Sequence, residues 1–486
     1  MSFKSKIPVA EINRENIGIV WPQLLNSIQQ AHIVAIDLEF SGLGDAPNKK
    51  AFSDRYKVAK ETVRTRTILS MGIATFRRKQ SNDPWNISYK CKEEFVIIFD
   101  LLSLESKPFV ADPEAFVFLS SHGFDFNRLF SHGIRYTKSA NGRENIFKSL
   151  FEEILASGVS LAFHNGLNDL LFIYEHFYTS LPECVDEFVA NVADWFGITD
   201  GSNFVNIESP TILDSKYLAL RSEEFEKSYL EYVFRKAQRL NHLRMETLNK
   251  SFVSIKFSKL PKDVKSEILF SRINVGLSEN FLKKNTTNIQ YEELCENYKN
   301  FGSCKNRQNC QKEHDNIQLN GTKKFKTKPE KTSEELIYEN NEHCIKATTS
   351  KSIASLSHLD SFESRGRHRA GVDAFMTGFS VLYFNLDINS GQNLNNGCLF
   401  DANLAARLPL PGKDFPLLLR KAERVRHYII ICSSSFFDKA SLSSKNLSCF
   451  SRKYINKGSR SNLYLPEMKN SLSPANVFAT SFSNSS

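Results

Sequence analysis

The stretch HIVAIDLEFSGLG, residues 32–44, begins as a buried strand and then carries two carboxylates. Asp37 follows the apolar run at residues 33–36, and Glu39 comes two positions later. Because side chains alternate along a strand, both carboxylates leave the same face and lie close together. Like charges at the end of a hydrophobic strand repel each other and resist desolvation. A bound cation would offset the repulsion between the two carboxylates. The alternative is that this end of the strand is exposed to solvent, which requires no cation.

Length and composition restrict the class of protein. The chain of 486 residues has room for two or three domains of about 150 residues each. No apolar run reaches the roughly 18 residues that a membrane helix needs, and residues 1–18 contain no apolar signal segment. We therefore expect a nuclear or cytosolic protein that does not bind a membrane. The formal charge of +9 allows an acidic partner, although a mild excess is also usual for a solvated surface.

The order of the expected elements indicates a mixed α/β fold. An amphipathic helix over residues 13–31 precedes the strand with the two carboxylates. Strand patterns follow at residues 67–76 and 93–102, and they predict an antiparallel meander. Residues 159–178 and 210–220 each change from strand to helix periodicity. A meander followed by such βα units is the order of a ribonuclease H-like mixed sheet flanked by helices.

Shifts in composition divide the chain further. We expect the core to cover residues 1–285 and to resume over residues 361–432. Between these parts lie a segment with a Cys/His cluster at residues 286–320 and a polar linker at residues 321–360. The Ser- and Asn-rich end, residues 433–486, is predicted to be a disordered tail.

Two further aspartates and a histidine are candidates for the same site as Asp37 and Glu39. Asp169 lies in the first turn of an expected helix, and Asp373 opens another, where each could instead complement the helix dipole. Carboxylates on separate elements could hold two Mg²⁺ or Mn²⁺ ions, which promote phosphodiester cleavage. His368, five positions before Asp373, could take a proton near neutral pH, or it could be a surface residue.

Three motifs carry a resemblance to a known family. DLE at residues 37–39, HNGLNDL at 164–170 and HRAGVDAF at 368–375 resemble the exonuclease motifs of the DEDD nucleases, in the branch with a histidine before the last aspartate. The likeness covers roughly residues 8–385 and extends to the deadenylase subgroup that includes poly(A)-specific ribonuclease. It implies a metal-dependent 3′-to-5′ exoribonuclease that removes 3′ adenosine tails or extensions, including those of small nuclear RNAs, and releases 5′-AMP.

The resemblance also implies roles for the candidate residues. Asp37, Glu39 and Asp373 would bind the ion that activates the attacking water. Asp37 would bridge to a second ion, which Asp169 would help to hold. His368 would be the general base. The partner implied is single-stranded RNA with a 3′ adenosine tail, and a homo-oligomer is compatible with the resemblance.

A second cluster of potential ligands lies between the second and third motifs. Cys295, Cys304, Cys310 and His314 are separated by eight, five and three residues, the pattern of a CCCH zinc finger. Three thiolates and an imidazole suit a closed structural Zn²⁺ site, which would stabilise this core-poor segment. The alternative is four unrelated residues. The basic run KKFKTKPEK at residues 323–331 could be a nuclear import signal, a nucleic-acid contact or a solvated linker. The resemblance favours nuclear import and is compatible with localisation to nuclear bodies.

Other functions stay open from sequence alone. A non-catalytic RNA-binding adaptor could use the same groove, although it would have no reason to keep His368 and Asp373 with the other acidic residues. An exonuclease of single-stranded DNA would differ in its contacts to the 2′-hydroxyl. Asp214 matches a position of the family outside the five proposed catalytic residues, and we expect it to be a structural neighbour.

Overall fold

The computed structural model describes ten parts of the chain: residues 6–44, 51–79, 91–138, 140, 144–196, 210–247, 250–266, 268–274, 369–386 and 404–420. The predicted zinc-finger segment (286–320), the linker (321–360) and the tail (433–486) lie outside these described residues. Their predicted boundaries therefore stay predictions.

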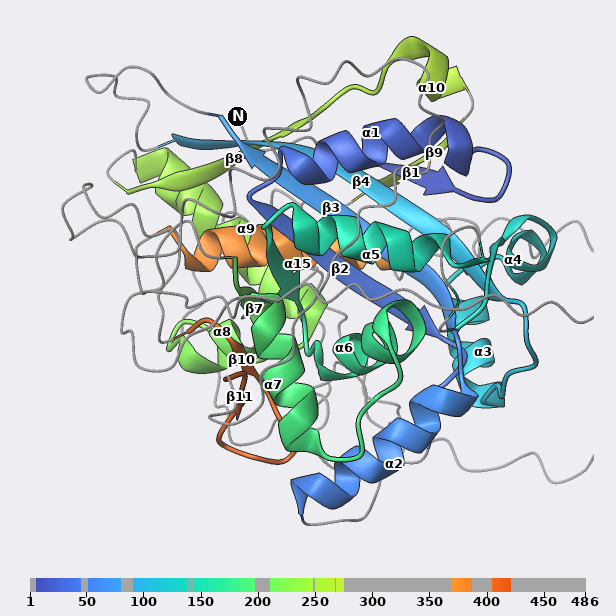
Figure 1. The fold of residues 1–486 in the computed structure, drawn as a ribbon. Coiled ribbons are helices and arrows are strands. Elements are labelled where there is room, and N and C mark those ends of the chain that lie inside the picture. The colour runs from blue at the N-terminus through green and yellow to red at the C-terminus, as the bar shows by residue number, and fades with distance from the viewer. Residues whose placement is uncertain are drawn as a thin grey trace, which may run out of the picture. The chain divides into compact units, whose positions relative to one another are not determined.

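A mixed sheet of nine strands is the centre of the described core (Figure 1). The strands are β1 (Lys6–Ile12), β2 (Ile33–Phe40), β3 (Ile68–Arg78), β4 (Cys91–Glu105), β5 (Ile134–Tyr136), β6 (Ser160–Phe163), β7 (Ile212–Asp214), β8 (Phe252–Phe257) and β9 (Leu269–Asn274). Their order is β7-β6-β2-β3-β4-β1-β9, and β5 and β8 also pair with β4. A separate two-stranded sheet contains β10 (Arg407–Leu408) and β11 (Leu417–Leu418).

The pairing within the large sheet confirms the expected fold class. Strands β2, β3 and β4 pair in antiparallel fashion as a meander. On the other side of β2, strands β6 and β7 are added in parallel, which requires crossover connections that contain helices. The fold is therefore the mixed, ribonuclease H-like α/β arrangement predicted from the order of elements.

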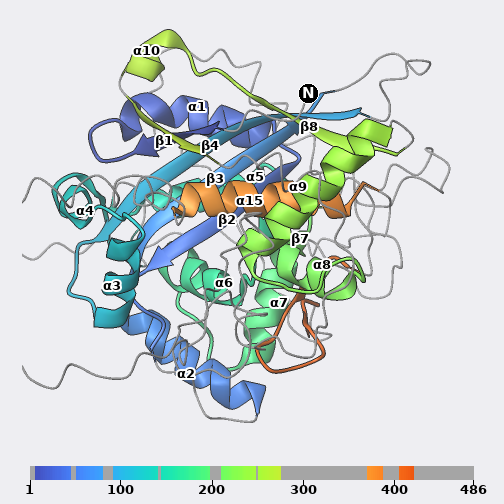
Figure 2. The same ribbon diagram turned by 180° about the vertical axis from the view of Figure 1, so that it is seen from behind.

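Helices cover both faces of the sheet. They are α1 (Ile17–Gln29), α2 (Phe52–Thr65), α3 (Pro113–Ser121), α4 (Phe126–His132), α5 (Ile146–Ala156), α6 (Leu167–Ile173), the π-helix η3 (Tyr174–Tyr178), α7 (Val185–Trp195), α8 (Ser215–Arg221), α9 (Leu230–Thr247), α10 (Lys262–Ser266) and α15 (Ala370–Phe384). Helices α1 and α5 lie over one face (Figure 1), whereas α9 and α15 lie over the other (Figure 2). None of the described helices is long and apolar enough to span a membrane.

The alternation of side chains in β2 sends its residues into two separate cores. Ile36 and Leu38 are buried in the core that includes α1 and α5. Ile33 and Ala35 are buried in the core that includes α9 and α15. Asp37 continues the second series, because its position has the same parity along the strand. The β2 carboxylates therefore lie on the face that α15 covers.

Candidate active site

The start of α15 lies directly against the sheet at Gly72. This glycine on β3 faces Asp37 on β2 across the antiparallel ladder. A Cβ atom added to Gly72 would come within 1.9 Å of the carbonyl group of Ala370 and within 2.3 Å of the nitrogen of Gly371. Only a residue without a side chain permits this approach of backbone to backbone. The contact brings Asp373, one turn into α15, next to the carboxylates of β2.

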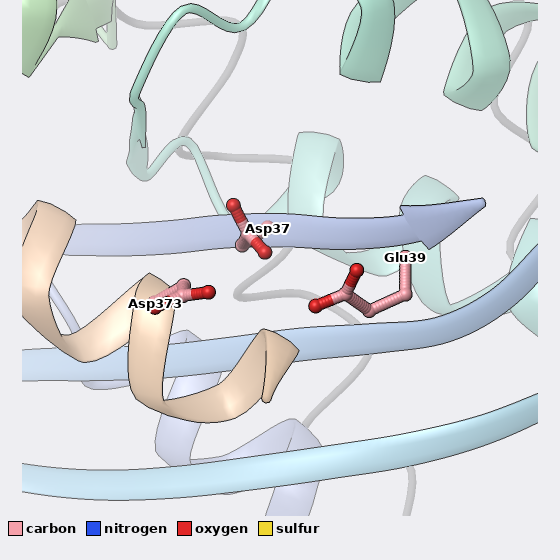
Figure 3. A group of neighbouring side chains, drawn as sticks. All are labelled: Asp37, Glu39 and Asp373. Carbon is pink, nitrogen blue, oxygen red and sulfur yellow. The ribbon is translucent and has the colours of Figure 1, made fainter. Parts of the chain in front are cut away.

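Three of the predicted metal ligands meet at this point. Asp37, Glu39 and Asp373 each offer a carboxylate oxygen, and these oxygens lie within 4.8 Å of one another. Figure 3 shows Asp373 reaching across from α15 and the carboxylate of Glu39 turned toward the other two. Asp373 is only 7% exposed, whereas Asp37 and Glu39 keep partial exposure. The site is therefore anchored in the core at Asp373 and partly exposed at Asp37 and Glu39.

Asp169 lies close to this cluster but is not one of its three members. It is in the first turn of α6 and is 8% exposed. Burial raises the pKa of Asp37 well above its ordinary value, and the charges of Asp373, Asp169 and Glu39 raise it further. Burial also raises the pKa of Asp169 itself to about 7. Asp169 thus belongs to the same electrostatic site, in which the carboxylates oppose one another's ionisation.

Asp214 holds the turn that leads to Asp169. Its carboxylate accepts hydrogen bonds from the backbone N–H groups of Asn165 at 3.2 Å and Gly166 at 2.8 Å. Two further N–H groups, at the start of α8, donate to it at 2.9 and 3.1 Å. Asn165 has a φ of +61°, a conformation that asparagine tolerates better than most residues. These bonds fit the structural role expected for Asp214.

Two charged residues that border the site are not predicted from the sequence. Asp100 on β4 faces Gly72 on β3, so it lies in the same row of the sheet as Asp37. Arg369, the residue before α15, donates from Nε to Oδ2 of Asp100 at 2.8 Å. These partners are 269 positions apart, and no local pattern marks such a pair. The single glycine within the β3 pattern is a signal that could have indicated the close helix contact.

The remaining predicted site residues are not placed by the structure. His368 immediately precedes the described Arg369 but itself lies outside the described residues. The four predicted zinc ligands, Cys295, Cys304, Cys310 and His314, also lie outside them. Their roles stay predictions.

The donor atoms of the cluster fit a hard divalent cation. Mg²⁺ and Mn²⁺ prefer oxygen ligands, and the cluster offers carboxylate oxygens from two separate elements. Burial raises the pKa values of Asp37, Glu39 and Asp373, and the charges of neighbouring carboxylates raise them further. A dication would offset this repulsion. Repulsion among these carboxylates does not stabilise the metal-free protein. It therefore favours a role of the cluster in binding a cation over a purely structural role.

Sheet, helix and acidic cluster together define a ribonuclease H-like protein with a nuclease-type site. The chain belongs to the CAF1 family of ribonucleases, whose pattern matches residues 12–146 and 140–381. It is 30% identical over 136 residues to poly(A)-specific ribonuclease PARN of Danio rerio, across 26% of this chain and 20% of that protein. Human PARN is 29% identical over 144 residues, across 28% of this chain and 22% of that protein.

These similarities extend over limited parts of the compared proteins. The chain covers about a fifth of the length of the two PARN proteins. Among solved structures, S. pombe Pop2p in its Mg²⁺- and Mn²⁺-bound form aligns with 44% of this chain and 75% of its own, at 17% identity and a TM-score of 0.31.

Proposed function

We propose that the protein is a divalent-metal-dependent 3′-to-5′ exoribonuclease that acts as a deadenylase. The observation that carries this proposal is the convergence of Asp37, Glu39 and Asp373 within 4.8 Å at the end of a buried strand. Membership of the CAF1 ribonuclease family and the similarity to poly(A)-specific ribonucleases support the reaction type and the adenosine substrate.

The chain's own residues have distinct parts in this reaction. Asp37, Glu39 and Asp373 would hold one divalent cation, and Asp37 and Asp169 a second. Cations bound there supply Lewis-acid polarisation of the phosphodiester and a more acidic water. The partial exposure of Asp37 and Glu39 leaves room for a phosphate to approach from the side of β2. The buried Asp373 keeps its place through the start of α15.

His368 is proposed as the general base that accepts the proton of the attacking water. Its chain neighbour Arg369 is fixed at the start of α15, where its carbonyl accepts from the N–H groups of Val372 at 2.8 Å and Asp373 at 3.0 Å. Replacing His368 with alanine should slow cleavage by roughly 10²- to 10⁴-fold with little change in RNA affinity. A near-normal rate would remove His368 from the mechanism.

The finer features of the proposal rest on sequence resemblance. The motifs and the Cys/His cluster resemble those of the deadenylase called target of early growth response protein one, which implies small nuclear RNAs with 3′ adenosine extensions as substrates. We further propose a nuclear location, a structural Zn²⁺ on Cys295, Cys304, Cys310 and His314, and self-association. Replacing Cys304 with serine should remove stoichiometric zinc and spare the cleavage of short oligonucleotides.

The proposed function is tested with 5′-labelled RNAs that differ only in a tail of A, U, C or G, beside a DNA of matching sequence. We expect the adenosine tail to shorten fastest in Mg²⁺ and every substrate to stay intact in chelator or with Asp37→Ala. RNA that is bound but never shortened would indicate an adaptor. Equal shortening of the DNA would indicate a DNA exonuclease, and equal rates on all four tails would contradict a deadenylase.

A further inference from the structure

Arg369 connects the start of α15 to three strands of the sheet. Its Nε donates to Oδ2 of Asp100 on β4 at 2.8 Å, and its Nη1 to Oγ of Ser271 on β9 at 2.6 Å. Its Nη2 pairs with Oε2 of Glu11 on β1 at 3.3 Å. The side chain of Arg369 is 17% exposed, and those of Asp100 and Glu11 are 4% and 7% exposed. These ion pairs are therefore largely shielded from solvent and less weakened by it than surface pairs are.

Strand register places the partners of Arg369 in line with the metal site. Asp37 faces Gly72, Gly72 faces Asp100, and Asp100 faces Glu11, across β2, β3, β4 and β1. Three carboxylates thus share one row on the face that α15 covers. The guanidinium of Arg369 pairs with Asp100 and Glu11 and leaves Asp37 to the metal site. Without it, the buried Asp100 would have no cationic partner among the described residues and Glu11 would keep only Arg128, and an unpaired buried charge is costly.

The same residue sets the first turn of α15. The backbone carbonyl of Arg369 accepts from the N–H groups of Val372 and Asp373 at 2.8 and 3.0 Å. The helix start is also in contact with Gly72 on the sheet, where the backbone of Ala370 leaves no space for a side chain. The side chain of Arg369 therefore fixes the helix on the sheet, and its carbonyl fixes Asp373 within the helix.

We propose that Arg369 is a positioning residue of the metal centre, which holds Asp373 at the distance from Asp37 and Glu39 that a divalent cation requires. This inference rests on the proposed function of the same site. A guanidinium offers a planar fork that bonds in several fixed directions, whereas the ammonium of lysine is a single point of charge. Arg369→Lys should thus keep the charge of the cluster and lose the geometry.

The test compares Arg369→Lys and Arg369→Met with the matched control Arg128→Lys. Arg128 on α4 pairs with the other carboxylate oxygen of Glu11, so the control perturbs the same ion cluster away from α15. Mn²⁺ binding to the folded proteins without RNA is measured by calorimetry, and melting temperature is measured in chelator. Mutating residues that orient metal ligands typically lowers metal affinity by about 10- to 100-fold. We expect a loss of Mn²⁺ affinity of that size in Arg369→Lys and Arg369→Met, and parental affinity in Arg128→Lys.

Kinetics separate positioning from a general loss of stability. For Arg369→Lys we expect kcat to fall, the KM for RNA to stay unchanged, and higher Mn²⁺ concentrations to restore the rate. Parental Mn²⁺ affinity in both folded Arg369 variants would overturn the inference, even if their melting temperatures were lower. If Arg369→Met does not fold, parental affinity of Arg369→Lys alone decides against it. Failure of the parent protein to bind Mn²⁺ would instead overturn the proposed metal site itself.

Discussion

Gly72 lies directly opposite Asp37 in the antiparallel pair of β2 and β3, and its missing side chain admits the start of α15 to the sheet. This one contact brings together a strand and a helix that are far apart in the sequence. The buried strand supplies Asp37 and Glu39, and the helix supplies Asp373. The acidic cluster therefore depends on a residue that has no functional group of its own.

Replacing Gly72 with alanine should separate α15 from β3, because the new Cβ atom would lie 1.9 Å from the Ala370 carbonyl. We expect a loss of about 1–3 kcal/mol in the free energy of unfolding, as for other overpacked cores, together with loss of Mn²⁺ binding. Denaturant unfolding in chelator and calorimetry with Mn²⁺ measure the two effects.

Gly18→Ala is the control for this substitution. A methyl group at Gly18, in the first turn of α1, would meet no heavy atom of the described residues within 4 Å. Alanine in a helix is generally preferred to glycine by roughly 0.5–1 kcal/mol, so this variant should be at least as stable as the parent. Unchanged stability and unchanged Mn²⁺ affinity in Gly72→Ala would contradict the role assigned to the Gly72 contact.

Asp37→Ala should abolish cleavage and leave the metal-free protein at least as stable as the parent. Burial and the neighbouring charges of Asp373, Asp169 and Glu39 raise the pKa of Asp37, so its ionised form is unfavourable when no cation is present. Melting in chelator measures the stability, and RNA cleavage in Mg²⁺ measures the activity. A large drop in melting temperature would show that Asp37 is a structural residue.

In chelator, stability should fall as the pH rises through about 7. Burial raises the pKa of Asp169 from 3.8 to about 7, so between these values the native state binds more protons than the unfolded state. The free energy of unfolding then decreases with rising pH. Buried His32 and His164, whose pKa values burial lowers from 6.5 to about 3, act in the opposite direction, but only below 6.5.

The informative range for this prediction therefore lies above pH 6.5. Mg²⁺ should reduce the slope of the free energy of unfolding against pH in that range. Burial also raises the pKa values of Glu94 to about 7 and Asp214 to about 6, and neither residue belongs to the metal cluster. The part of the slope that Asp169→Asn removes is the contribution of Asp169, and Asp37, Glu39 and Asp373, whose pKa values burial also raises, contribute further. A melting temperature in chelator that rises with pH over this range would contradict the prediction.

Asp214→Ala should destabilise the fold without altering the three-carboxylate cluster. The variant loses four hydrogen bonds from backbone N–H groups, including those of Asn165 and Gly166. We expect a loss of at least about 2 kcal/mol, because hydrogen bonds to a charged group are worth about 1.5–3 kcal/mol each. Unfolding and Mn²⁺ binding at low temperature are measured together. Full stability combined with lost cleavage would indicate a catalytic role instead.

Local patterns are sufficient to predict the strand of Asp37 and Glu39, the meander, and the turn before Asp169. These features depend on side-chain alternation and on turn residues that lie next to one another in the chain. The convergence of Asp373 with the strand is implied by family resemblance, since periodicity alone cannot bring two distant elements together. The structure confirms the fold class and shows Asp373 beside Asp37.

Features formed by distant pairing are not predicted from the sequence. Strand β1 lies between β4 and β9, and β9 is more than 250 positions away in the sequence. The β1 sequence KIPVAEI also contains a proline that weakens the strand pattern. The ion pairs of Arg369 with Asp100 and Glu11 span 269 and 358 positions. Such contacts become visible only when the sheet order is known, because register decides which side chains share a row.

The most direct test of the proposed exonuclease compares two forms of one 5′-labelled RNA with an adenosine tail, ending in a 3′-hydroxyl or a 3′-phosphate. Family resemblance implies that the 3′ end of the RNA would lie near Glu39, and a terminal phosphate would then add negative charge where like charges repel. The 3′-hydroxyl form should shorten one nucleotide at a time in Mg²⁺, release 5′-AMP and stay intact in chelator, while the 3′-phosphate form should resist. Internal cuts, cleavage of a circular RNA, or equal digestion of both forms would contradict the proposed function.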